Sequence, residues 1–237
     1  DVVAAPGQVK YLSEELGWEN VALVTTTGLD YSESLTDIYR PALEEYRLEI
    51  VAEETIMEGD TNFSAVVTSL SSKDFDGVIF TGYYTEGGLF LKEMRKQDMQ
   101  QVIAGGDGLL GKELYELGGE AAEGSMVYTG FAVDMDRASE KTKAFIEEYK
   151  ANNDDNIPDM FAAQGYDAVM WLADAIEEAN SSDPTEFRET LVKTENWEGV
   201  TGVITLDENR EPIKNPVYIL EVKDSQFSVA GAIDINS

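Results

Sequence analysis

The sequence predicts an α/β protein: a doubly wound parallel sheet that forms one lobe, plus a partial, mostly helical remnant of a second lobe. Short apolar runs rich in β-branched residues alternate with amphipathic stretches from residue 1 to about 131. Beyond residue 131 this alternation stops, and two helical patterns follow each other directly. At 237 residues, the chain is longer than one typical domain, which fits either one large α/β unit or one domain with part of a second.

Five short apolar runs in the first part are typical of strands buried on both faces. The expected strands span residues 21–27, 50–56, 77–81, 101–104 and 125–129. Apolar residues at helical spacing predict helices over 2–16, 35–46, 63–70, 86–96 and 109–117, with Asp60 or Thr61 capping the third. Because helices connect successive strands, we expect a parallel sheet with helices on both of its faces.

The second part of the chain is rich in helical patterns. Expected helices span 137–151, 160–179 and 185–192, with a polar linker over 152–158, and expected strands span 202–206, 217–222 and 227–233. The helix over 160–179 carries large apolar residues such as Phe161 and Val169, and the segment offers no obvious sheet to cover them. We therefore expect an incompletely covered apolar face, through which the chain could also associate with a second copy.

Acidic residues dominate the composition. Asp and Glu number 47 against 17 Lys and Arg, so the net charge is −30 at pH 7. Such a surface repels nucleic-acid phosphates and anionic lipids, so neither is expected as a partner. The excess of acid is consistent with solubility or with saline surroundings, and it identifies no ligand.

The residue inventory also argues against an enzyme. The chain contains no Cys and no His, which excludes thiol nucleophiles, disulfides and Ser-His catalysis. Asp134, Asp136 and the run 152–155 lack the Gly and terminal Glu of a calcium loop, and 105–108 lacks the Lys and Ser/Thr of a phosphate loop. We expect no catalytic residues, no metal and no cofactor. The sequence also contains no run of 18 or more apolar residues, and its start does not read as a secretion signal.

Three expected strands end in residues suited to binding an organic cation. The first leads to Tyr31, the third to Tyr83, and the fourth to Asp107 within a Gly-Gly-Asp-Gly segment. Carboxyl ends of parallel strands share one edge of the sheet, where ligands bind in open α/β folds. A carboxylate pairs with an ammonium, and tyrosine rings attract cations. The alternative is that each tyrosine only packs and that the Asp caps a turn.

Seven short motifs occur in the order found in one known family. They lie at 30–35 (DYSESL), 59–64 (GDTNFS), 81–86 (TGYYTE), 105–108 (GGDG), 121–124 (AAEG), 162–168 (AAQGYDA) and 199–207 (GVTGVITLD). Over nearly its whole length the chain thus resembles the type I periplasmic binding proteins, in particular the branched-chain amino-acid (Leu/Ile/Val) binding proteins of ABC transporters.

This resemblance implies roles for four residues. Tyr31 and Tyr83 are expected to flank the ligand, and Asp107 is expected to pair with its α-ammonium group. Phe161 is expected to contribute to the pocket for the ligand side chain. Leucine-binding members usually have Glu where Asp107 stands, so the carboxylate here is one methylene shorter.

The resemblance further implies a two-lobed protein that closes by a hinge around an α-amino acid, catalyses nothing and docks onto membrane permease subunits. Residues 1–131 and 208–237 are expected to form the ligand-binding second lobe, and 132–207 a remnant of the first, whose N-terminal part the chain is expected to lack. The expected location is periplasmic or extracellular, with a lipoprotein anchor as one option. The alternative function is a ligand-sensing regulatory or receptor module of the same fold, responsive to amides or amino acids.

Overall fold

The computed structural model describes residues 1–214 and 216–233. The described chain divides into two compact units. Unit 1 comprises Asp1–Thr129 and Tyr218–Ile233, and unit 2 comprises Gly130–Val217. The expected lobe segment 208–237 includes residues 215 and 234–237, which lie outside the described residues.

Unit 1 is built on a mostly parallel sheet, which confirms the predicted fold class. Within the described residues the sheet has seven strands in the order β10-β9-β5-β4-β3-β1-β2. The strands are β1 (Asn20–Thr27), β2 (Glu49–Met57), β3 (Gly77–Thr81), β4 (Ile103–Gly105), β5 (Met126–Thr129), β9 (Val217–Lys223) and β10 (Gln226–Ile233). β1 to β5 pair in parallel, and β9 pairs antiparallel with β5.

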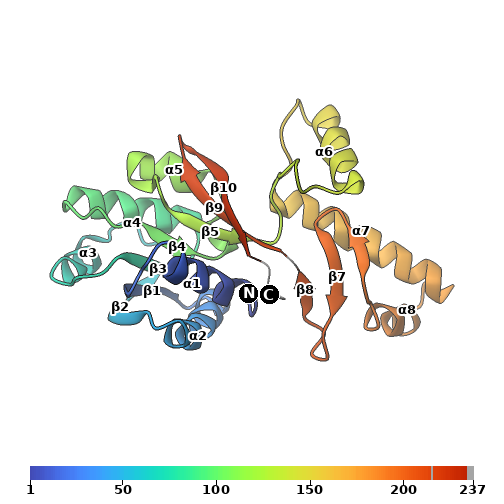
Figure 1. The fold of residues 1–237 in the computed structure, drawn as a ribbon, viewed down its shortest axis with the longest axis horizontal. Helices are drawn as coiled ribbons and strands as arrows, with labels where there is room; N and C mark the ends of the chain where they lie inside the picture. The colour runs from blue at the N-terminus through green and yellow to red at the C-terminus, as the bar shows by residue number, and fades with distance from the viewer. Residues whose placement is uncertain (215, 234–237) are drawn as a thin grey trace. The chain divides into compact units, whose positions relative to one another are not determined.

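Helices cover both faces of this sheet (Figure 1). They are α1 (Ala4–Glu14), α2 (Asp30–Glu45), α3 (Ser64–Leu70), α4 (Tyr84–Lys96) and α5 (Glu113–Gly118), with 3-10 turns η1 (Asp107–Leu109) and η2 (Gly119–Ala122). Ala22 and Val24 of β1 share one apolar cluster with Phe80 of β3 and Phe90 of α4. Because strand side chains alternate between faces, this pattern places α3, α4 and α5 on one side, and α1 and α2 pack on the other (Figure 1).

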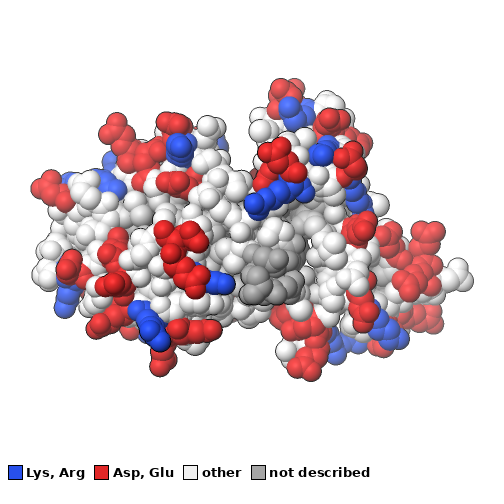
Figure 2. All heavy atoms as spheres, in the orientation of Figure 1, with Lys and Arg blue, Asp and Glu red and all other residues white. Residues whose placement is uncertain are grey.

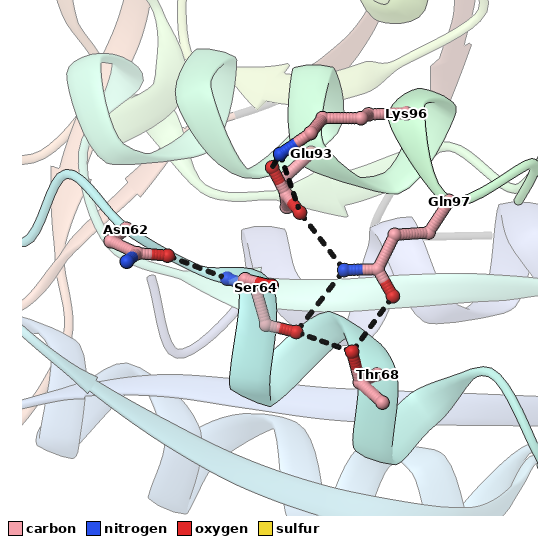
Figure 3. A network of polar contacts seen from close by, with 6 residues as sticks. All are labelled: Asn62, Ser64, Thr68, Glu93, Lys96 and Gln97. Carbon is pink, nitrogen blue, oxygen red and sulfur yellow. Dashed lines mark hydrogen bonds and ion pairs between the residues drawn. The ribbon is translucent and has the colours of Figure 1, made fainter.

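The start of α3 differs from the prediction. Phe63 occupies the N-cap position without a side-chain cap, so the predicted cap by Asp60 or Thr61 is wrong; the Asp60 carboxylate instead accepts the Met57 N–H at 2.8 Å. A polar network ties α3 to α4 (Figure 3): the Gln97 amide donates to the Ser64 carbonyl at 3.1 Å and accepts from the Thr68 hydroxyl at 2.9 Å. This network fixes the helix pair that follows β2 and β3.

Unit 2 combines three helices with a small antiparallel sheet. Its elements are α6 (Glu140–Asn152), α7 (Met160–Ala179), α8 (Pro184–Leu191), β6 (Trp197–Gly199), β7 (Gly202–Leu206) and β8 (Pro212–Lys214). β7 pairs with both β6 and β8, so the chain stays in unit 2 beyond residue 208 and returns to unit 1 at Tyr218. The family resemblance implied this return near residue 208, whereas the short strand β8 (Pro212–Lys214) belongs to the sheet of unit 2.

The Asp167 carboxylate links α7 to the turn between β6 and β7. This side chain is 3% exposed and accepts hydrogen bonds from Val200 N (2.7 Å), Thr201 N (2.8 Å) and Thr201 Oγ1 (2.6 Å). A side chain at Gly199 would place its Cβ 2.4 Å from Asp167 Oδ2, so the turn needs glycine there. On another face of α7, Phe161 and Val169 are 53% and 66% exposed within the described residues.

The surface is strongly acidic. On the face drawn in Figure 2, Asp and Glu side chains are widespread and Lys and Arg are scattered among them. No helix in the described part of the chain has the length and apolar character needed to span a bilayer.

Candidate ligand-binding site

The strand order of unit 1 reverses between β1 and β3, and the carboxyl ends of these strands are where ligands bind in open α/β sheets. After β1 the chain runs through α2 to β2 on one side, and the later strands β3, β4 and β5 lie on the other side. At such a reversal of strand order, the helices leave on opposite faces and open a gap in which ligands bind. Tyr31 follows β1 in the first turn of α2, Tyr83 is the N-cap residue of α4 after β3, and Asp107 follows β4.

The three side chains lie together. The Tyr31 hydroxyl donates to Asp107 Oδ1 at 3.2 Å and accepts the Gly108 N–H at 3.0 Å. The rings of Tyr31 and Tyr83 are stacked, with centroids 5.3 Å apart and planes inclined by 23°. One edge of unit 1 therefore presents two parallel phenol rings beside a carboxylate that is already oriented by a hydrogen bond.

Two glycines make this close approach sterically feasible. A Cβ on Gly106 would lie 2.7 Å from the Tyr31 hydroxyl and 2.8 Å from the Tyr128 hydroxyl, and one on Gly108 would lie 2.8 Å from the Tyr31 ring. The sequence pointed to 105–108 as the segment that carries Asp107, with a simple turn as the alternative, and it did not show this steric role of the glycines. The signal was present as three glycines around Asp107, but the neighbours that require them, Tyr31 at Gly106 and Gly108 and the Phe80 carbonyl at Gly105, come from other parts of the chain.

Burial raises the pKa of the Tyr31 phenol. Loss of water around the hydroxyl is the main cause, and the nearby Asp107 charge raises the pKa further. The hydroxyl, which is protonated at neutral pH as in any tyrosine, therefore stays protonated in alkaline solution as well. Tyr83 is 38% exposed, so its ring can contact a ligand from solvent.

Phe161, the fourth predicted site residue, lies on α7 in unit 2. Tyr31, Tyr83 and Asp107 lie in unit 1, and each unit is described by itself. The role of Phe161 in the ligand pocket therefore stays a prediction. Among the described residues, no group of three or more His, Cys, Asp or Glu side chains is arranged to hold a metal ion.

A cavity of about 540 Å³ in unit 2 shares no residue with this cluster. Its lining includes Trp171 and Trp197, whose indole N–H groups already donate to Thr194 Oγ1 and Asp174 Oδ2, each at 2.8 Å. These hydrogen bonds join α7 to Thr194 and to Trp197, the first residue of β6, which accounts for both indoles structurally.

Residues 3–226 match the family described as "Periplasmic binding protein". The match extends over most of the chain, so the chain belongs to this family, and the resemblance drawn from the seven motifs is confirmed.

Characterised relatives place the chain near amino-acid-binding members. A leucine-, isoleucine-, valine-, threonine- and alanine-binding protein from Pseudomonas aeruginosa is 27% identical over 215 residues, which are 91% of this chain and 56% of that protein. A Leu/Ile/Val-binding protein from Rhizobium johnstonii is 33% identical over 185 residues, 78% of this chain and 48% of that protein. The chain thus spans about half the length of these relatives.

Solved structures give the same result. A leucine-binding protein from Thermotoga maritima superposes with a TM-score of 0.92 at 32% identity, covering 99% of this chain and 66% of that one. A branched-chain amino-acid transporter substrate-binding protein from Streptococcus pneumoniae, in complex with isoleucine, gives 0.87 at 32% identity, covering 98% and 65%.

Proposed function

We propose that unit 1 carries the ammonium-binding half of a site for an α-amino acid, in an extracytoplasmic solute-binding protein of an ABC transporter. The observation that carries this proposal is the cluster of Tyr31, Tyr83 and Asp107 beyond the carboxyl ends of β1, β3 and β4. Its chemistry suits a protonated primary amine, because a carboxylate and two aromatic faces all attract a cation.

Each residue has a distinct role in this proposal. Asp107 forms the ion pair with the ammonium group, and Tyr31 holds the carboxylate in place by its hydrogen bond. Tyr83, stacked on Tyr31 and open to solvent on one side, covers the ligand. Phe161 of unit 2 contributes to the pocket for the ligand side chain when the lobes of the whole protein close by a hinge.

A branched-chain or other apolar α-amino acid is the proposed ligand. The relatives named above bind leucine, isoleucine and valine according to their descriptions. The S. pneumoniae structure holds isoleucine. In the transport role, the closed form would present a changed surface to the permease subunits, and the family's periplasmic location would apply to this chain.

The test is an NMR titration of the ¹⁵N-labelled chain with L-leucine, because half a site is expected to bind weakly and in fast exchange. The amide signals of Gly106 and Gly108 should shift progressively. The amine-free analogue 4-methylpentanoate should leave them in place at equal concentration, because it lacks the group that pairs with Asp107.

Two variants make the titration specific. Asp107→Asn should weaken leucine binding at least about tenfold, since hydrogen bonds to charged groups are worth about 1.5–3 kcal/mol. Asp30→Asn is the matched control, because it makes the same change of charge at an exposed residue next to Tyr31, in the first turn of α2. Equal effects of the two variants, or no shift with any of the twenty amino acids, would overturn the proposal.

A further inference from the structure

A buried amide group holds the backbone from which Asp107 projects. Gln8 of α1 is 0% exposed, yet α1 is amphipathic and a glutamine would ordinarily face water. Its Nε2 donates to the Gly105 carbonyl at 3.1 Å and lies 3.4 Å from the Met126 carbonyl. Gly105 ends β4 and Met126 begins β5, so one side chain bridges two neighbouring strands at the base of the loop.

A buried phenol orients this amide. Tyr39 of α2 is 0% exposed, and its hydroxyl donates to Gln8 Oε1 at 2.5 Å. Burial raises the pKa of Tyr39 well above its ordinary value, so the hydroxyl keeps its proton even in alkaline solution. With Oε1 accepting from Tyr39, the amide NH₂ group must point at the two carbonyls, and its orientation is fixed.

The loop between Gly105 and Asp107 has little freedom to absorb a shift. A Cβ on Gly105 would lie 2.4 Å from the Phe80 carbonyl oxygen, and one on Gly106 would lie within 2.9 Å of three side chains. The backbone is therefore packed closely against β3 and the phenol rings. A displacement of the Gly105 carbonyl would pass to Asp107, two residues further on.

We infer that Gln8 and Tyr39 are positioning residues for Asp107, a role that rests on the proposed function of Asp107 as the ammonium partner. They do not touch the ligand. They set the position of the 105–108 backbone, which in turn sets where the Asp107 carboxylate meets the hydroxyl of Tyr31.

A double-mutant cycle tests this inference through L-leucine binding. Tyr39→Phe removes only the hydroxyl that orients Gln8, and should weaken binding about two- to tenfold, as expected for the loss of one hydrogen bond. In the Asp107→Asn background the same substitution should have almost no effect, because the group it positions is already gone. The same factor in both backgrounds would overturn the inference.

Thr36→Val is the matched control. The Thr36 hydroxyl is also buried in unit 1, at 2.8 Å from Thr25 Oγ1 and 2.7 Å from Thr81 Oγ1. Its removal costs comparable buried hydrogen bonds without touching the Gln8 amide, and should leave the affinity for leucine within about twofold.

Hydrogen exchange in the ligand-free chain gives a second readout, independent of any ligand. In Tyr39→Phe, exchange at the Gly108 amide should accelerate about tenfold more than at Leu23 in the central strand β1. Equal acceleration at both amides would mean a general loss of stability and would refute the positioning role. If Tyr39→Phe does not fold, Gln8→Met serves the same comparison. If wild-type protein binds no amino acid, the proposed function fails. The exchange experiment still tests whether Tyr39 holds the 105–108 backbone in position.

Discussion

Alkaline pH should unfold unit 1 steeply, because the phenols around its binding edge are held away from water. Tyr39 and Tyr128 are 0% and 2% exposed, and Tyr31 is partly buried. Burial is the largest cause that raises the pKa of all three phenols above the ordinary value of about 10. The unfolded chain releases these protons near pH 10, whereas the folded unit retains them.

The magnitude follows from this difference in proton binding. The stability is fully present below about pH 10 and is lost as the pH rises toward the raised pKa values of the folded unit. Each phenol that stays protonated in the folded state lowers the free energy of unfolding by about 1.4 kcal/mol at pH 11. Three such phenols together lower it by about 4 kcal/mol. This is a large part of the 5–15 kcal/mol typical of a domain.

Urea denaturation of the chain at several pH values, followed by circular dichroism, measures the effect. Tyr39→Phe should reduce the slope of unfolding free energy against pH above pH 10 by about 1.4 kcal/mol per unit, in addition to a constant loss at neutral pH. Tyr166→Phe, which removes a phenol that is 40% exposed, is the control. Parallel slopes for wild type and Tyr39→Phe would refute the reasoning.

Three further predictions concern packing and charge. Asp167→Asn should lower the stability of unit 2 by about 2–4 kcal/mol, because an amide nitrogen would replace an acceptor of buried donors; a loss below about 1 kcal/mol in urea denaturation would contradict this. Gly108→Ala should displace the Tyr31 ring, because the new Cβ would lie 2.8 Å from it. The stability of unit 1 should fall by about 1–3 kcal/mol, and a crystal structure with Tyr31 in its original position would contradict this. Raising KCl from about 0.1 to 1 M should raise the melting temperature, because the net charge of −30 is screened over about 3 Å instead of 10 Å; a constant or falling melting temperature would argue against self-repulsion.

Elements with strong local signals were predictable from the sequence. The helix over Met160–Ala179 was predicted at both ends, and the structure shows the local residues that fix them: Asp159 caps its first turn and Asn180 adopts the left-handed conformation that ends it. The helix expected over 109–117 instead divides into η1 and α5. Gly111 lies between them, and its Cα is packed so closely on the Tyr84 ring that a Cβ would lie 2.5 Å away. That contact is tertiary and leaves no local sequence signal.

The proposed binding edge was predictable only in part, for a similar reason. Strand ends supply Tyr31, Tyr83 and Asp107, and the rule that parallel strands share one carboxyl edge was enough to bring them together. Gln8 escaped notice, because a polar residue in an amphipathic helix is ordinarily assigned to the solvent face. Its burial depends on the carbonyls of β4 and β5 and on Tyr39, all more than 30 positions away.

In such an acidic chain, net charge cannot explain why one carboxylate should select an ammonium group. Exposed carboxylates are hydrated and mobile, and they attract any cation weakly at physiological salt. Asp107 differs because it is partly buried and accepts a hydrogen bond from Tyr31. Its backbone is also confined by glycines, and the Gln8 amide holds the strand end that leads into it. In the proposed function, an amine at this edge meets a carboxylate that is already ordered and partly desolvated. Little binding free energy is therefore lost in ordering the Asp107 side chain. Under this proposal, selectivity at this edge therefore depends on the rigidity of the 105–108 backbone at least as much as on the charge of Asp107.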